Sequence, residues 1–424
     1  MLISGLGILA AILGVVYGSN LSSNPELLRY APLLLIMGGG VCLLATTLFY
    51  TSLLMPLAKM EEALVSGLFT LLQQDRLLAF FRFFLFAFPL VSFGIAVLFL
   101  MGLPPSVWIF WGWIIGLGMY LDFLRKSWKG TEKFLDPSLL VNEFLHKARW
   151  AIQNEKDDQL WNSLDSLGEI AVRAVQKEKI SLIGKALDTF PLIVKTFFAS
   201  SKSIARVNID ENVKQATGRD EASYTLFYLL QRLKLVHEKA VGSGLESVCL
   251  HLVRVMGKII VLCAEFDLSM VALPVRFLSR FGVKAENSRF EDESVLITST
   301  LLEISKKIAT DIDIRYGSLE ECFRAIVRGM DEMAKAAFRN DKNTNIPLLI
   351  QPFLDLKTLF KGEKLAQHRD TPVILQEIEG VLAQFEALNQ FMRAIPSPSG
   401  MEAILPQEGQ TLKEAPPSTN RSDA

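Results

Sequence analysis

Long runs of apolar residues dominate the first 124 positions of the chain, and the longest cover residues 31–55, 83–103 and 105–122. A bilayer core about 30 Å thick requires roughly 20 apolar residues in a helix that rises about 1.5 Å per residue. The third run is short, but the Pro104-Pro105 pair at its start makes a tight turn that brings both neighbouring helices to one interface. We therefore expect transmembrane helices at these three positions.

A shorter apolar run covers residues 2–18, and two interpretations of it are open: a retained transmembrane helix or a cleaved signal peptide. A signal peptide has a basic segment before its apolar part and a motif of small residues at the cleavage site. The chain has neither feature before Ser19. A retained span is therefore favoured, which predicts a four-span transmembrane helix bundle over residues 1–124.

Residues 56–78 have a different periodicity, because their large apolar side chains recur every three or four positions. This spacing predicts an amphipathic helix. Such a helix either lies in the inner membrane interface or docks onto the domain that follows. Its polar face is of mixed charge rather than densely basic, so docking is slightly favoured.

From residue 137 to about residue 395 the apolar positions follow helical spacing almost throughout, which makes the predicted fold all-α. Asp136 is suited to cap the first of these helices, with Pro137 at its first position. We expect ten helices, at Ser138–Gln153, Gln159–Gln176, Ile180–Ser200, Ala222–Val241, Gly244–Phe266, Met270–Phe281, Ser294–Ile312, Leu319–Arg339, Ile346–Leu359 and Val373–Ala394.

Weak internal similarity suggests how these helices are arranged. Leu164–Leu167 resembles Leu187–Phe190, and Met330–Met333 resembles Leu354–Lys357, with a short polar turn inside each pair. Two architectures remain open: a solenoid-like stack of helical hairpins and an irregular helical bundle. We expect loops at residues 201–222 and 283–293, and a disordered tail over residues 396–424, which is rich in Pro, Ser, Gln, Glu and Gly.

Charge divides the chain at Arg125, since only nine charged residues precede it: Glu26, Arg29, Lys59, Glu61, Glu62, Asp75, Arg76, Arg82 and Asp122. None of them lies within a long apolar run. Residues 125–136 form a basic juxtamembrane linker of the kind retained in the cytoplasm. The expected location is the inner or plasma membrane, with several spans, a cytoplasmic helical domain at 137–395 and both termini in the cytoplasm.

The balance of charge, the charge-free apolar runs and the cysteine count argue against several other classes of protein. The net charge is −1, which gives no electrostatic reason to expect nucleic acid as a partner. The charge-free apolar runs argue against an ion-coupled transporter, because ions need polar groups in hydrocarbon. Four scattered cysteines are too few for a disulfide framework.

No motif for phosphate binding, zinc hydrolysis, serine hydrolysis or dithiol chemistry occurs in the chain. Cys249 and His251 are two positions apart and so point to different faces of a helix, which argues against zinc. Paired acids, such as Asp157-Asp158, are typical of exposed helix ends. The sequence therefore predicts no catalytic, cofactor-binding or metal residues, no cofactor, and a non-enzymatic role.

Two basic groups are candidate contacts with a membrane surface or a partner protein. The first comprises Arg125, Lys126, Trp128, Lys129 and Lys133; the second comprises Arg276, Arg280 and Lys284, which form a stripe along one helix. Each also has a simpler explanation, namely a topology signal for the first and a solvated helix face for the second.

Two Gly-x-x-x-Gly spacings occur in the apolar runs, at Gly14 and Gly18 and at Gly112 and Gly116. They indicate close helix packing, either within the bundle or in a homo-oligomer.

These observations favour a membrane-anchored scaffold or regulatory protein whose helical domain binds another protein at the cytoplasmic face. Two alternatives remain open. A subunit of a membrane channel or transporter would need a polar path between the spans. A membrane-bound enzyme would need acidic or histidine side chains, such as His146, Glu143, Asp165 and Glu169, to converge in one cleft.

Overall fold

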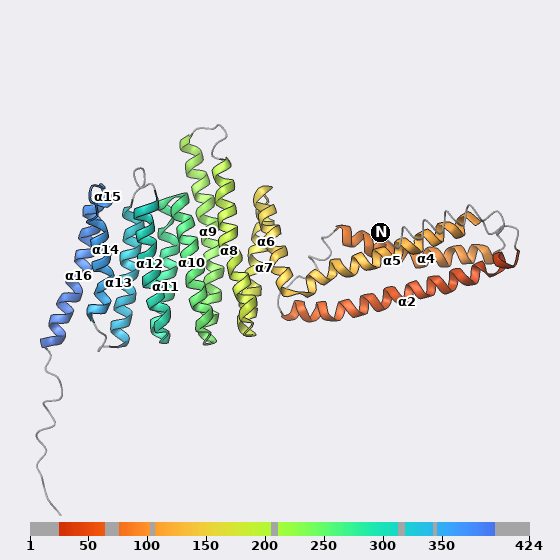
Figure 1. The fold of residues 1–424 in the computed structure, drawn as a ribbon, viewed down its shortest axis with the longest axis horizontal. Coiled ribbons are helices and arrows are strands. Elements are labelled where there is room, and N and C mark those ends of the chain that lie inside the picture. Colours follow the sequence, from red (N-terminus) through yellow and green to blue (C-terminus); the bar gives the residue numbers. More distant parts are fainter. Residues whose placement is uncertain are drawn as a thin grey trace, which may run out of the picture.

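The computed structural model describes residues 25–63, 76–101, 107–204, 211–312, 319–341 and 346–394 of the 424-residue chain. Within these ranges the fold is helical and has no strand, which confirms the all-α prediction. Figure 1 shows two parts, a bundle of long N-terminal helices and a row of shorter helices that begins at α6.

The N-terminal bundle consists of α2 (Pro25–Ala63), α4 (Arg76–Leu100) and α5 (Val107–Leu135), and each of these helices packs against the other two. Their outer surface is apolar: side chains such as Met37, Val41, Leu44, Phe83 and Leu90 are more than half exposed. An exposed apolar surface of this extent is typical of a membrane or protein contact.

Hydrogen bonds between helices hold the interior of the bundle together. The Thr46 hydroxyl donates to the Leu85 carbonyl and lies 2.7 Å from the Tyr120 hydroxyl, which donates to the Cys42 carbonyl. These groups link α2, α4 and α5 at one level. Polar bonds of this kind stabilise helix pairs where lipid provides no hydrophobic driving force.

Among the described residues, three helices are long and apolar enough to cross a membrane: Tyr30–Glu62 within α2, Leu77–Leu100 within α4, and Glu246–Phe266. The expected count of four is therefore not confirmed. The run at 105–122 lies in α5, which is not among the three. Its tryptophans and glycines dilute the apolar character, the run ends with Asp122, and Arg125 and Lys126 follow shortly after. Residues 2–18 lie outside the described residues.

The third apolar helix, Glu246–Phe266, was not expected as a span, and its position explains its composition. It lies in the row of short helices, where 56% of its apolar window is buried against protein, compared with 28% for α2 and 33% for α4. A helix that is apolar on most faces is suited either to lipid or to a protein core. Here neighbouring helices cover it.

The row of short helices forms a two-layered stack. Each helix packs against the next but one: α6, α8, α10, α12 and α14 contact in sequence in one layer, and α7, α9, α11, α13 and α16 in the other. The bounds are α6 (Pro137–Gln153), α7 (Asp157–Gln176), α8 (Ile180–Ile204), α9 (Glu211–Gly242), α10 (Glu246–Phe266), η1 (Leu268–Met270), α11 (Ala272–Ser288), α12 (Glu291–Asp311), α13 (Glu320–Asn340), α14 (Ile346–Phe360), α15 (Glu363–Ala366) and α16 (Thr371–Ala394).

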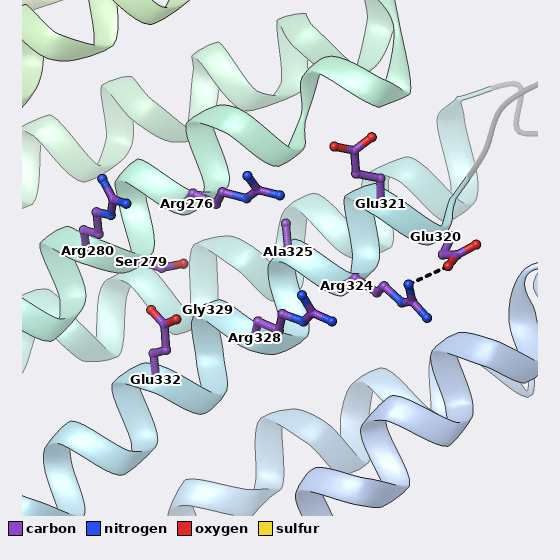
Figure 2. Close-up of a pocket in the computed structure, with 10 residues that line it drawn as sticks. All are labelled: Arg276, Ser279, Arg280, Glu320, Glu321, Arg324, Ala325, Arg328, Gly329 and Glu332. Carbon is purple, nitrogen blue, oxygen red and sulfur yellow. Dashed lines mark ion pairs between the residues drawn. The ribbon is translucent and has the colours of Figure 1, made fainter.

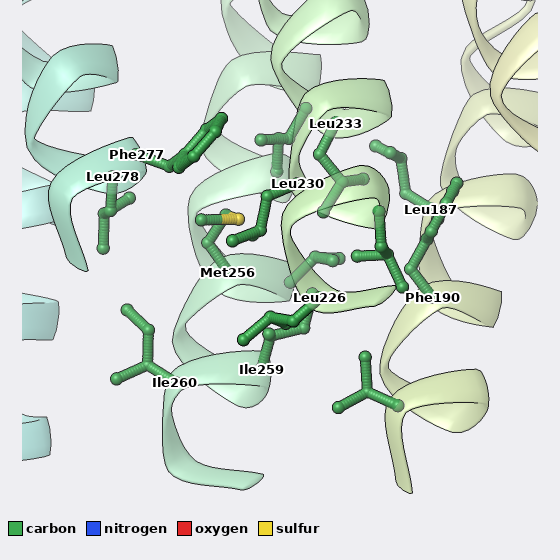
Figure 3. Packing of buried hydrophobic residues seen from close by; sticks show 14 of the residues in the cluster. Leu187, Phe190, Leu226, Leu230, Leu233, Met256, Ile259, Ile260, Phe277 and Leu278 are labelled. Carbon is green, nitrogen blue, oxygen red and sulfur yellow. The ribbon is translucent and has the colours of Figure 1, made fainter. Parts of the chain in front are cut away.

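The core of the stack lies between the two layers. Figure 3 shows its central part, where Met256 of α10 and Leu230 of α9 lie between Leu278 of α11 and Phe190 of α8. Each of these side chains is fully buried. This core continues through every helix pair. The stack is therefore held together by burial of the same periodic apolar residues that predict its helices.

All ten predicted helices of this region are present, and the Asp136 carboxylate caps α6 by accepting from the Ser138 amide at 2.8 Å. The expected loops were too long. Helix α9 already begins at Glu211, and α11 continues to Ser288, so that little of residues 283–293 lies outside a helix. The turn there is set by Arg289, whose backbone is left-handed (φ 63°).

The span expected at 31–55 and the start of the amphipathic helix expected at 56–78 are parts of one helix, because α2 passes through Pro56 and continues to Ala63. Residues 64–75 of the expected amphipathic helix, and the tail at 396–424, lie outside the described residues. The expected linker at 125–136 forms the last turns of α5 and the cap of α6.

Arg173 of α7 joins the stack to the bundle. Its guanidinium donates to the carbonyls of Glu61 (3.1 Å) and Glu62 (2.7 Å), in the last turn of α2, and pairs with Glu169 at 2.6 Å. A cation at the C-terminal end of a helix satisfies open carbonyls and complements the helix dipole. The end of α2 is thus bound to the first helices of the stack.

Candidate functional site

A charged groove lies between α11 and α13 and encloses about 550 Å³. Figure 2 shows the side chains that line it, which come from these two helices. We call it the arginine groove; its lining comprises Arg276, Ser279, Arg280, Glu320, Glu321, Arg324, Ala325, Arg328, Gly329 and Glu332.

Close contact between the two helices brings these charges together. A Cβ atom at Gly329 would lie 1.9 Å from the Ser279 hydroxyl oxygen, and a Cβ at Gly282 would lie 2.0 Å from the Met333 sulfur. Only the absence of a side chain on each glycine allows this approach. The floor of the groove is therefore a tight helix crossing, with the arginines above it on either side.

On the α13 side, Arg324 and Arg328 are held by acidic partners. Arg324 pairs with Glu320 at 2.6 Å and with Glu377 of α16 at 3.0 Å, and the Arg328 Nε lies 2.7 Å from the same Glu377 carboxylate. Helix α16 thus braces both guanidinium groups from outside the groove.

On the α11 side, Arg276 and Arg280 are exposed, and within the described part of the chain neither makes an ion pair. The same holds for Glu321 and Glu332 of α13. The groove therefore presents free cations and free carboxylates together. Its chemistry is suited to binding by charge rather than to catalysis, since its one hydroxyl, on Ser279, donates to the Val275 carbonyl.

Two of the four arginines of this groove belong to the basic stripe that the sequence predicts as a candidate contact. Arg276 and Arg280 line the groove as members of the predicted stripe, whereas Lys284 is exposed beyond it. Arg324 and Arg328 were missed, although their four-residue spacing on one helix is the same signal. What the sequence does not contain is the pairing of α11 with α13.

The first basic group occupies the end of α5 nearest the stack. Arg125, Lys126 and Lys129 are exposed, and the Lys126 ammonium lies 5.8 Å from the centre of the Phe81 ring. Trp128 is half-exposed and packs 5.8 Å from the Phe49 ring. Lys133 belongs to the same helix, but its side chain lies outside the described residues.

The two glycines of α5 differ in their surroundings. A Cβ atom on Gly116 would lie 2.6 Å from the Phe88 ring of α4, whereas a Cβ on Gly112 would have no neighbour within 4 Å. Gly116 therefore serves packing inside the bundle. Gly14 and Gly18 lie outside the described residues.

The residues that an enzyme would bring together have other contacts. Asp165 accepts from Tyr228 and pairs with Arg232, Glu169 pairs with Arg173, and His146 is exposed. His251 turns away from Cys249 and lies 3.2 Å from the Asp188 carboxylate.

Comparison of the chain with protein-family models, with curated proteins and with solved structures finds no match. Its function must therefore be inferred from its own groups.

Proposed function

We propose that this protein is a membrane-anchored scaffold whose helical stack binds a protein segment of mixed, mainly acidic charge in the arginine groove. The observation that carries this proposal is the pair of free guanidinium groups, Arg276 and Arg280, opposite the braced pair Arg324 and Arg328. Guanidinium groups bind carboxylates in bidentate geometry, so the two free groups, Arg276 and Arg280, form a ready contact for acidic side chains.

The free carboxylates favour a protein over a phosphate or a lipid headgroup. Glu321 and Glu332 would repel a compact anion, but they can pair with the basic residues that an acidic protein segment also carries. A helical segment with opposite charges four residues apart matches the spacing along α11 and α13.

The anchoring part of the proposal assigns α2, α4 and α5 to the membrane. The first two are apolar enough to cross it, and α5 runs beside them in the same bundle (Figure 1). The basic residues Arg125, Lys126 and Lys129 lie at the end next to the stack, which favours a cytoplasmic position for that end and for the solenoid-like stack at the inner or plasma membrane. Both termini are cytoplasmic in this proposal if residues 2–18 form a further span.

In this orientation the stack projects away from the membrane, because it extends from the end of the bundle (Figure 1). Neighbouring helices in a layer are about 10 Å apart, so α11, two positions after α7, lies roughly 20 Å further out. The arginine groove is then too far from the headgroups to serve as a lipid site, which again favours a protein partner.

The interior of the bundle gives less support to a channel. Thr46, Tyr120 and Ser92 are buried, and they bond to neighbouring helices or to their own backbone rather than facing an open path. Trp113 of α5 donates to Ser92 of α4 at 2.8 Å. Within the described bundle these polar groups act as links between helices.

The test is capture of partners by chemical crosslinking in native membranes. The full-length protein is compared with the double variant Arg276→Glu/Arg280→Glu and with Lys284→Glu, which changes the next charge on the same helix but lies outside the groove. The proposal predicts a partner whose crosslinked segment is acidic, whose recovery falls at least about tenfold in the double variant, and which the control retains. Binding should also weaken as salt rises.

Three outcomes would contradict the proposal. The first is that the double variant retains the partner at the level of the wild type. The second is that the crosslinks come solely from a second copy of this chain. The third is that vesicles containing phosphatidylserine bind the groove and that Arg276→Glu/Arg280→Glu abolishes this binding.

A further inference from the structure

A second cluster of reactive side chains lies inside the stack, apart from the arginine groove. It consists of His237 of α9, Cys249 of α10 and Glu293 of α12, each at most 1% exposed. The His237 Nε2 and Glu293 Oε1 atoms are 2.6 Å apart, and the nitrogen, sulfur and carboxylate atoms of the cluster all lie within 4.8 Å of one another.

The fold brings these residues to one edge of the stack. His237 lies near the end of α9, Cys249 in the first turn of α10 and Glu293 in the first turn of α12. The imidazole stacks on the Phe281 ring of α11, with centroids 4.1 Å apart and planes inclined by 9°. This contact fixes the ring and directs Nε2 at the carboxylate.

The cluster is incompletely satisfied as it stands. The second carboxylate oxygen, Glu293 Oε2, is buried and has no hydrogen-bond partner. Burying such an oxygen is costly unless it gains a partner. Burial, and next the Glu293 carboxylate, raise the pKa of the Cys249 thiol, which is therefore protonated at neutral pH.

We propose that His237, Cys249 and Glu293 bind one zinc ion that links α9, α10 and α12. Imidazole, thiolate and carboxylate are the usual zinc ligands, and three of them leave a fourth position for water. On binding, two protons leave to solvent: one from the Cys249 thiol and one from His237 Nε2, where it lies between the imidazole and the Glu293 carboxylate. The imidazole then coordinates through Nε2 as the neutral ring. One thiolate and one carboxylate then balance the two positive charges of the ion, so that the buried site is neutral overall.

The geometry requires little movement. Zinc bonds of about 2.0–2.3 Å in a tetrahedral arrangement place the ligand atoms roughly 3.3–3.8 Å apart. The His237 and Glu293 atoms must therefore separate by less than about 1 Å. A mixed nitrogen and sulfur set favours zinc over magnesium or calcium, which prefer oxygen ligands.

This proposal does not depend on the proposed function, because it concerns a closed site within the core. The full-length protein, purified in detergent and freed of metal with a chelator, is titrated with zinc and with cobalt(II), which reports its ligands by colour. We expect one equivalent of either metal, a thiolate-to-cobalt absorption band, and a higher melting temperature with zinc than without it.

Two matched variants locate the site. Cys249→Ser removes the ligand thiol and should abolish the absorption band, while Cys263→Ser, which changes another buried cysteine of α10, should leave it unchanged. Wild-type protein that binds no stoichiometric metal would show that His237 and Glu293 form only a structural ion pair. A band that persists in Cys249→Ser would assign the metal to other residues. The first result does not depend on whether a variant folds, since it is read on the wild type.

Discussion

Asp370 fixes the start of α13 from a part of the chain about 50 residues away. Its Oδ2 accepts hydrogen bonds from the Leu319 amide (2.8 Å) and the Glu320 amide (3.3 Å). Burial acts to raise the pKa of Asp370, but these two donors, together with His368 and Arg369, outweigh it and hold the pKa below its ordinary value. The ionised carboxylate is therefore favoured in the folded protein.

We expect Asp370→Asn to lower the melting temperature at pH 7 by about 2–4 °C, because the two backbone amides then lose their charge-assisted hydrogen bonds to a carboxylate. The pKa of Asp370 in the folded protein lies below its unfolded value of about 3.9. The wild type therefore keeps its extra stability above about pH 3.9 and loses it as the pH falls through the folded pKa. Melting curves at pH 7 and near pH 3 measure the difference. The control, Asp355→Asn, changes an exposed carboxylate on α14. Equal melting temperatures for wild type and Asp370→Asn at pH 7 would contradict the assignment.

Gly329 sets the distance between α11 and α13. In Gly329→Ala the new Cβ would also lie 2.8 Å from the Ser279 Cβ, which cannot be relieved by rotating the hydroxyl. We expect a loss of about 1–3 kcal/mol in stability as the helices separate. Gly380→Ala on α16 is the control, since its Cβ would have no neighbour within 4 Å, and it should be neutral or slightly stabilising. Similar melting temperatures for the two variants would rule out the tight crossing.

At the scale of elements, apolar periodicity predicts the helices of the stack well, because each helix buries one face in a continuous core. It does not predict their ends. Residues 283–293 look polar and loop-like, yet most of them are helical, since Ala285 of α11 is buried while Lys284 faces solvent. Hydropathy also misjudges α10, because a largely buried core helix and a membrane span have similar compositions.

Arg173 is the polar contact by which α7 holds the end of α2. We expect Arg173→Ala to loosen the stack relative to the bundle without unfolding either part, because three hydrogen bonds are lost at one point. Spin labels at Met55→Cys and Lys179→Cys should then give a broader distance distribution. Lys177→Ala, which removes an exposed cation at the end of α7, should leave the distribution unchanged. A distribution equally narrow in Arg173→Ala would show that apolar contacts alone set the angle.

At the scale of the whole molecule, neither candidate site could be read completely from the sequence. Arg276 and Arg280 stand out as a stripe, but their counterparts lie on α13, and only the fold places them opposite each other. The cluster of His237, Cys249 and Glu293 spans more than 50 positions and has no local motif. In both cases the missing information is which helices become neighbours.

In the proposed topology, the stack is anchored in the membrane and presents the arginine groove to the cytoplasm. The four native cysteines are buried, so a single introduced cysteine can be labelled selectively with a membrane-impermeant maleimide. In intact cells we predict labelling of Met101→Cys, at the far end of the bundle, and labelling of Glu321→Cys, in the groove, only after the membrane is permeabilised. Labelling of Glu321→Cys in intact cells would place the groove outside the cell and contradict the proposed topology.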